Sequence, residues 1–78
     1  MALGKYSHAQ GQETIANGDY SFATGFATIA SGMHSSVFGK FNIEDNEEKY
    51  AFIIGNGTDE ENRSNAFAVD WNGAGFFK

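Results

Sequence analysis

The residues of this chain that could do chemistry are two histidines, ten carboxylates and a regular series of hydroxyls. His8 and His34 lie in neither a His-x-His nor a His-Glu-x-x-His pattern, the spacings that bring two imidazoles to one metal ion. A single histidine could hold a metal ion only together with its copies in other chains, as His34 would on a three-fold axis. A surface or turn position is the simpler expectation for this residue. We therefore predict no metal site and no cofactor.

The carboxylates gather in two short acidic segments, at residues 44–48 and 59–61. Clustered carboxylates suit a hard cation such as calcium, but the first segment lacks the glycine and the terminal glutamate of an EF-hand loop. A glycoside hydrolase needs two carboxylates that face each other across a cleft, and a cluster within one loop does not provide that geometry. We predict that both segments are solvated loops and that Glu13 and Asp19 are turn residues.

The hydroxyls recur too regularly to be nucleophiles, because a nucleophile is a single residue beside a single base. They stand seven residues apart, at Ser7, Thr14, Ser21, Thr28 and Ser35. The glycines that accompany them do not form a phosphate-binding loop, since no Lys-Ser/Thr pair follows and no helical pattern comes next. We expect no catalytic residue and no enzymatic activity.

The elements that position these residues are copies of one seven-residue unit, Ser/Thr-x-Ala-x-Gly-x-x, which recurs over residues 2–41. A coiled coil shares this period but needs large apolar residues in two positions, and a helix would lose about 1 kcal/mol at each glycine. A strand of about five residues in each unit, followed by a tight turn, instead places the three small residues on one face. We predict that the glycine ends the strand and gives the turn its backbone freedom. These turn glycines are Gly4, Gly11, Gly18, Gly25, Gly32 and Gly39.

Two units make one coil of fourteen residues, and successive coils are expected to stack through parallel ladder bonds into a flattened β-roll. Alternate units differ in the residues that point outwards. One series presents Leu3, Ile15 and Ile29, an aliphatic column that we expect to pack against another subunit. The other series presents Phe22 and Phe38, so both outward faces are partly apolar and either could be the contact surface.

The second half of the chain predicts a small antiparallel module after an acidic connector at residues 42–49. Residues 50–54 are apolar on both faces, with Tyr50, Phe52 and Ile54 on one, which indicates a strand buried on both sides. Residues 64–71 alternate, with Phe67, Val69 and Trp71 sharing a face. The Asn72-Gly73 pair is a strong hairpin signal, so residues 75–78 should return as the partner strand.

Size and charge restrict the function classes. A chain of 78 residues whose regular positions hold serine, alanine and glycine buries little apolar area, and small domains compensate through disulfides, metals or oligomerisation. The chain has no cysteine, so oligomerisation is the expected route. The net charge of −5 argues against a nucleic-acid partner, and no apolar run is long enough for membrane insertion.

Two groups of motifs carry a family resemblance. Ser7-His8-Ala9-Gln10-Gly11 and Ser21-Phe22-Ala23-Thr24-Gly25 resemble the head repeats of trimeric autotransporter adhesins. Residues 49–58, 62–67 and 69–73 are similar to a segment that follows such repeats in phage tail-fibre-like proteins. Together the resemblances cover nearly the whole chain. They imply a left-handed β-roll, a homotrimer, and a place in a phage or prophage virion tail or on a bacterial cell surface.

We therefore expect an all-β chain in three parts: a short parallel β-roll of seven-residue half-coils at residues 1–41, the connector at 42–49, and a trimerising hairpin module at 50–78. The expected function is a structural segment of a tail fibre or adhesin-like fibre, with other fibre or tail segments as neighbours. The alternative is an adhesin head that binds a host glycan or protein receptor.

These two functions predict different surface residues. The residues expected at the trimer interface are Leu3, Ile15, Ile29, Phe52, Ile54, Phe67, Val69 and Trp71. The residues expected to contact a ligand in the alternative function are Tyr6, Tyr20 and Phe26.

Overall fold

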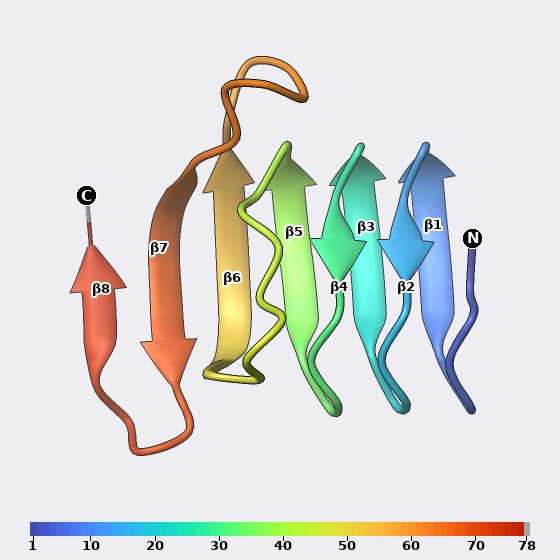
Figure 1. Ribbon diagram of the computed structural model, residues 1–78, viewed down its shortest axis with the longest axis horizontal. Coiled ribbons are helices and arrows are strands. Elements are labelled where there is room, and N and C mark those ends of the chain that lie inside the picture. Colours follow the sequence, from blue (N-terminus) through green and yellow to red (C-terminus); the bar gives the residue numbers. More distant parts are fainter. Residues whose placement is uncertain (78) are drawn as a thin grey trace.

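The computed structural model describes residues 1–77, which form strands joined by turns and loops (Figure 1). A six-stranded sheet has the order β1-β3-β5-β6-β7-β8, and a two-stranded sheet pairs β2 with β4. The strands are β1 (His8–Gln12), β2 (Ile15–Ala16), β3 (Phe22–Phe26), β4 (Ile29–Ala30), β5 (Ser36–Lys40), β6 (Tyr50–Asn56), β7 (Asn65–Asp70) and β8 (Gly75–Phe77). The predicted all-β class is confirmed, and residues 1–77 contain no helix long and apolar enough to cross a membrane.

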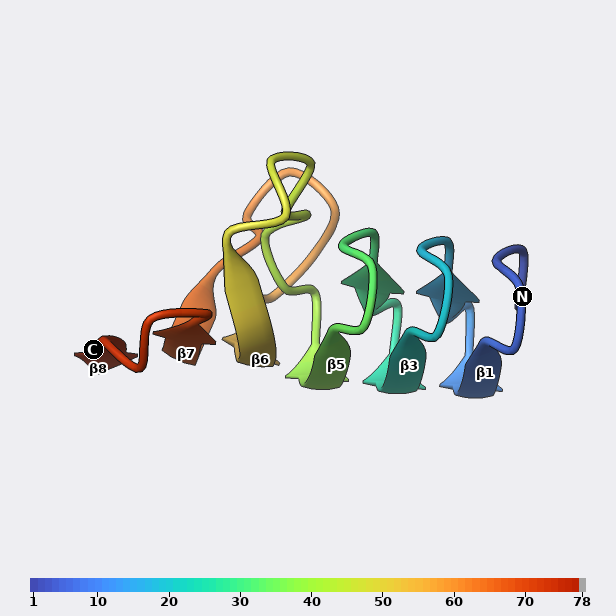
Figure 2. The ribbon, with the colours of Figure 1, turned by 90° about the horizontal axis from the view of Figure 1, so that it is seen from below.

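Stacked parallel coils build the N-terminal half. His8 pairs with Phe22 in the large sheet and Ile15 pairs with Ile29 in the small one, so each coil is displaced by fourteen residues from the next. Figure 2 shows the six-stranded sheet as one nearly flat row, with β2 and β4 on one side of it. We call that side, with the turns and the connector that lie on it, the second layer. This solenoid-like stacking confirms the predicted parallel arrangement.

The two halves of each coil are unequal. Strands β1, β3 and β5 have five residues, as predicted, but β2 and β4 have two. The prediction of a five-residue strand in every half-coil is therefore wrong for the second layer. The reason is visible in the ladder: the backbone N–H groups of Asn17 and Gly18 both donate to the carbonyl of Ala30, so the chain turns there and the ladder stops.

The left-handed residues of the turns are not glycines. They recur at the seven-residue step, at Tyr6, Glu13, Tyr20, Ala27, His34, Phe41 and Glu48. Each stands just before the serine, threonine or asparagine position, except for Glu48 beyond the repeat. Inter-coil hydrogen bonds hold them: the N–H of Tyr20 donates to the carbonyl of Lys5, and that of His34 to the carbonyl of Asp19. The sequence predicted that the repeat glycines supply the backbone freedom of the turns. For the residue with left-handed backbone this prediction is wrong, because other residue types occupy that position.

Glycine is required for close approach between coils instead. Gly11, Gly25 and Gly39 lie inside β1, β3 and β5 with φ of 116°, 115° and 98°. A Cβ atom at Gly11 would overlap with the carbonyl oxygen of Gly25 in the next coil. Gly4, Gly18 and Gly32 do stand at turns, and there too a Cβ at Gly4 or Gly18 would strike the backbone of the following coil.

The repeated hydroxyls satisfy buried backbone groups. The Oγ atoms of Ser7, Ser21 and Ser35 donate to the carbonyls of Gly4, Gly18 and Gly32 at 2.7, 2.6 and 2.7 Å. Four of the five hydroxyl residues are buried, Ser7 being half-buried. Each of these carbonyls also accepts a hydrogen bond from the N–H of the same serine, so the hydroxyl and the backbone close the turn together, and the structural interpretation of this position agrees with the contacts.

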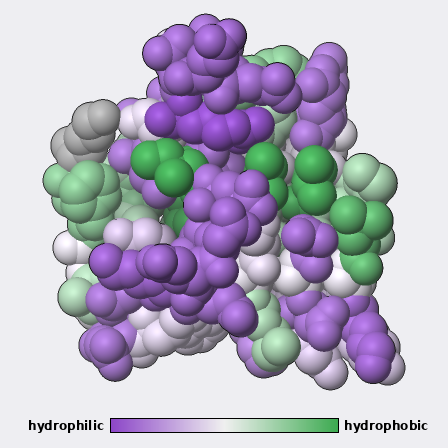
Figure 3. Space-filling view, viewed as in Figure 1, coloured by the Kyte–Doolittle hydropathy of each residue, from purple (hydrophilic) through white to green (hydrophobic). Residues whose placement is uncertain are grey.

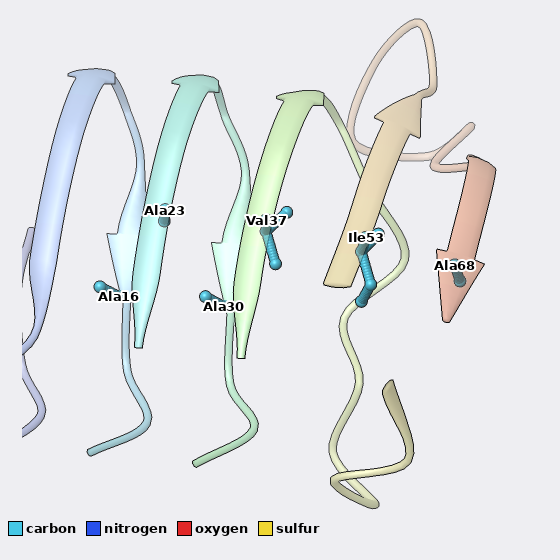
Figure 4. Packing of buried hydrophobic residues seen from close by; sticks show 6 residues of the cluster. All are labelled: Ala16, Ala23, Ala30, Val37, Ile53 and Ala68. Atoms are coloured by element: carbon cyan, nitrogen blue, oxygen red, sulfur yellow. The ribbon is translucent and has the colours of Figure 1, made fainter. Parts of the chain in front are cut away.

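The core between the layers is thin and consists mostly of alanine. Its cluster is Ala16, Ala23, Ala30, Val37, Ile53 and Ala68, which lie in one row along the coils (Figure 4). Small side chains let the two layers approach closely, and larger ones enter only at Val37 and Ile53, where the roll meets the C-terminal strands. The small residues of the repeat therefore face inwards, as the alternation predicts.

Strand β6 continues the roll. It pairs parallel with β5, and Ser36 stands opposite Phe52, an offset of sixteen residues where the repeat has fourteen. Strands β7 and β8 then run antiparallel in the same sheet. A register shift between Tyr50 and Phe52 places Tyr50 against the core cluster, so its predicted place on the face of Phe52 is wrong. Trp71 lies in the turn after β7, so its predicted place in a strand with Phe67 is also wrong.

Two asparagines and an arginine end the second layer. Asn42 is fully buried; its Oδ1 accepts from the N–H of Ile29 at 2.7 Å and its Nδ2 donates to the carbonyl of Ile29 at 3.0 Å. Its side-chain amide thus takes the place of a backbone strand. Asn65 Oδ1 accepts from the N–H of Ile43, and Arg63 Nη1 donates to the carbonyls of Ala27 and Asn42.

Candidate interaction surface

One face of the six-stranded sheet is apolar and points away from the core. Residues that alternate with Ala23, Val37, Ile53 and Ala68 project from it. We call this surface the aromatic face and define it by Phe22, Thr24, Phe26, Ser36, Phe38, Lys40, Phe52, Ile54, Phe67, Val69 and Phe77, with His8, Gln10 and Gln12 at its N-terminal edge.

A continuous ladder of rings crosses the aromatic face. The ring centroids are 5.1 Å apart from His8 to Phe22, 5.5 Å from Phe22 to Phe38 and 5.3 Å from Phe38 to Phe52. The ladder continues at 6.2 Å to Phe67 and at 5.6 Å to Phe77. It therefore connects all six strands. Cross-strand pairs of this kind stabilise a sheet, and they also form one unbroken apolar strip.

The aromatic side chains are not in the core. Among residues 1–77, which hold all eight phenylalanines, three tyrosines and the tryptophan, none of these rings is buried. Phe22, Phe38 and Phe52 are half-buried by their neighbours in the ladder, and Phe77 is 83% exposed. Proteins ordinarily bury most phenylalanine side chains, and a large exposed apolar patch marks an interaction site.

Charge is distributed unevenly around this face. Nine of the ten carboxylates lie outside the strands: Glu13, Asp19, Glu44, Asp45, Glu47, Glu48, Asp59, Glu60 and Glu61. The tenth, Asp70, ends β7 and accepts hydrogen bonds from the N–H groups of Asn72 and Ala74 in the following turn. The aromatic face carries Lys40 and the imidazole of His8 as its ionisable groups. It is thus free of carboxylates in an acidic chain.

The residues predicted for the trimer interface fall on two opposite surfaces and a turn. Phe52, Ile54, Phe67 and Val69 project from the aromatic face. Leu3, Ile15 and Ile29 lie on the outer side of the second layer, where Ile43 extends the column of Ile15 and Ile29 and Leu3 is in register with Asn17. Trp71 lies in the turn between β7 and β8 and is 52% exposed. One planar contact cannot include both surfaces.

The residues predicted to contact a ligand lie apart from each other. Tyr6 and Tyr20 stack at 5.4 Å, and Tyr20 stacks on His34 at 4.9 Å, at one edge of the roll. Both faces of the Tyr20 ring are therefore covered, which leaves Tyr6, at 82% exposure, as the ring of this stack that a sugar could cover. Phe26 ends β3 and meets Phe41 edge-on at 5.1 Å.

The acidic connector works as a set of caps. Glu44 accepts a hydrogen bond from Ser31 Oγ, Asp45 from the N–H of Tyr50, and Glu48 from the N–H of Met33. In the described part of the chain, no three His, Cys, Asp or Glu side chains come together as a metal-binding group. The carboxylates of the connector therefore accept hydrogen bonds from neighbouring turn and strand groups.

A cavity of about 250 Å³ opens where the second layer ends. It is lined by Ile43, Tyr50, Ser64, Asn65 and Phe76. Its amide oxygen, Asn65 Oδ1, already accepts from Ile43, and the rest of its lining is mainly apolar.

Sequence analysis missed Asn42 and Asn65, although a signal for Asn42 was present. Asn42 occupies the next position of the hydroxyl series, seven residues after Ser35, and Ile43 occupies the next position of the Ile15 column. Asn65 carried no such signal, because it lies outside the repeat and its partner, Ile43, is distant in the sequence. In comparisons with known proteins, no family model matches this chain, and neither curated proteins nor solved structures yield a match.

Proposed function

We propose that this chain is a structural segment of a homotrimeric fibre, of the kind that forms phage or prophage tail fibres and adhesin-like fibres, and that it carries no catalytic activity. Its neighbours would be other fibre or tail segments, in a virion tail or on a bacterial surface. The stacked coils supply a rigid unit that repeats along one direction, which suits a fibre. The sequence resemblance supplies the fibre class and the number of subunits.

One observation carries this proposal: the chain buries alanines and exposes its aromatic rings. A core of small side chains gives little hydrophobic stabilisation, since this scales with apolar area at about 25 cal/mol per Å². The aromatic face leaves large apolar side chains in contact with water in a monomer, from the half-buried Phe22 and Phe38 to the exposed Phe77. Association of copies removes that area from water and adds what the core lacks.

The proposal is tested by the mass of the folded protein in solution. Light scattering on a size-exclusion column should give three times the chain mass of 8.5 kDa, with a strand-rich circular dichroism spectrum. A folded monomer would refute the trimeric fibre segment, because the aromatic face would then be stable in water on its own.

The alternative, an adhesin head that binds a host glycan or receptor, has one specific observation in its favour. Tyr6 is 82% exposed at the end of the Tyr6–Tyr20–His34 stack, and a free aromatic face can bind a sugar ring. Glycan-array binding that is lost in Tyr6→Ala and kept in Tyr20→Phe would favour this alternative. The absence of binding to every sugar on the array would exclude the glycan-binding form of this alternative.

A further inference from the structure

We propose that the aromatic face is the surface through which three copies of this chain meet. The three flat sheets would form the walls of a triangular prism around the fibre axis, with the second layers outside. This inference rests on the proposed function in one respect, the number of copies. It decides between the two apolar surfaces that the sequence left open.

The strand length fits three walls. Five residues extend about 17 Å, so an equilateral prism of that width places each sheet about 5 Å from the axis, which is half of the spacing of about 10 Å between packed sheets. A phenylalanine side chain spans that distance. The aromatic side chains of three ladders, each running from Phe22 to Phe77, would therefore fill the interior of the prism and leave no channel along its axis.

The flatness of the sheet supports the same arrangement. Sheets normally twist by about 20–25° per strand, and flat ones are stabilised by stacking or by side-chain ladders. The six strands form a nearly flat row (Figure 2), with an aromatic ladder along it. A flat wall can stay in contact with its neighbours along the whole 29 Å length of the molecule, whereas a twisted one would diverge.

Charge distinguishes this surface from the opposite one. The connector, with Glu44, Asp45, Glu47 and Glu48, lies on the second-layer side, and Figure 3 shows that side as mostly hydrophilic with a short row of apolar groups. Contact through the Ile15 column would bring the acidic connectors of chains with net charge −5 towards one another. Contact through the aromatic face keeps them outside, in solvent.

The partner is accordingly a second and third copy of this chain. A copy offers the same carboxylate-free aromatic strip, so each wall meets a surface of matching chemistry. An anionic lipid surface fits less well, since the chain is acidic and the face has Lys40 as its one lysine.

Matched aspartate pairs test the assignment. Phe22→Asp with Phe38→Asp places two charges in neighbouring coils on the aromatic face, and Ile15→Asp with Ile29→Asp does the same on the second layer. In light scattering, the first pair should abolish the three-chain species and the second should retain it. Retention by the first pair, or loss in the second, would overturn the inference.

A labelling experiment avoids variants that might merely unfold. The chain has no cysteine, so a single Thr24→Cys reports on the aromatic face and a single Asn17→Cys on the second layer. Relative to the same chain in urea, a maleimide should modify the first thiol at least about tenfold more slowly, because it must wait for opening of the assembly. The second thiol should react at nearly the unfolded rate.

The outcomes separate the two proposals. If the unsubstituted chain is a monomer or a dimer, the trimeric fibre segment fails, and this inference fails with it. If the chain is a trimer in which Thr24→Cys reacts fast and Asn17→Cys slowly, the trimer stands and only the assignment of the face is wrong.

Discussion

At the scale of single residues, glycine and the left-handed residues have separate tasks. Left-handed backbone costs a residue other than glycine about 1–2 kcal/mol, yet the turns use tyrosine, glutamate, alanine, histidine and phenylalanine there. Hydrogen bonds to the preceding coil hold these residues, as in Ala27 N–H to the carbonyl of Gln12. Glycine is kept for positions where the next coil leaves no room for a Cβ atom. Strict register therefore comes from inter-coil distance as well as from turn geometry.

Gly25→Ala should show this requirement most clearly. Its Cβ would overlap with the carbonyl oxygen of Gly39, and its φ of 115° is unfavourable for alanine. Backbone cannot move aside cheaply inside a ladder, so we expect the free energy of unfolding to fall by about 3 kcal/mol, measured by urea unfolding at fixed chain concentration.

Gly75→Ala is the matched control, because a Cβ atom there has nothing within 4 Å. It should change the free energy of unfolding by less than about 0.5 kcal/mol. Equal losses in the two variants would show that contact between coils is not what the repeat glycine serves.

At the scale of elements, the seven-residue period predicted the features that every coil shares. It did not predict the features that arise where the repeat ends or where the two half-coils differ. Coil length, the parallel ladder and the inward face of alanines follow from spacing, since every coil repeats the same contacts. The short strands of the second layer were missed because both half-coils carry the same motif, and their difference arises in the ladder at Ala30. The parallel pairing of β6 was missed because its offset of sixteen breaks the period.

The candidate interaction surface was predicted only in part for a related reason. Alternation put Phe52 with Ile54 on one face of one strand and Phe67 with Val69 on one face of another, and the structure pairs the two strands so that all four lie on the aromatic face. Alternation within a strand does not show which strands become adjacent, so the continuation of the ladder to His8 and Phe77 required the sheet order.

Asn42→Ala tests how the second layer ends. The substitution removes both hydrogen bonds to the backbone of Ile29, and the N–H and carbonyl groups left there are shielded from water. We expect a loss of about 2–4 kcal/mol in the free energy of unfolding, measured by urea unfolding. Asn46→Ala changes an exposed residue of the same connector and should have little effect. A loss in Asn46→Ala as large as in Asn42→Ala would contradict the capping role.

At the scale of the whole molecule, the chain divides its apolar residues by size. Mostly small ones join the two layers of one copy, and six of the eight phenylalanines lie on the aromatic face. Folding and association should therefore be linked, because the monomer lacks the buried area on which small domains depend. The acidic loops lie at the strand ends and on the second layer, away from the aromatic face.

Linked folding and association make the thermal midpoint depend on chain concentration. A factor of ten in an equilibrium constant corresponds to about 1.4 kcal/mol. For a trimer that dissociates as it unfolds, a tenfold increase in chain concentration therefore raises the free energy of unfolding by two thirds of that amount, or about 0.9 kcal/mol per chain. For a domain of this size that corresponds to a rise of about 4–8 °C in Tm. Circular dichroism melts across a hundredfold range of concentration would measure it, with Phe22→Asp/Phe38→Asp as the comparison. The native chain should show the rise, and a midpoint independent of concentration would mean that one copy holds its fold unaided.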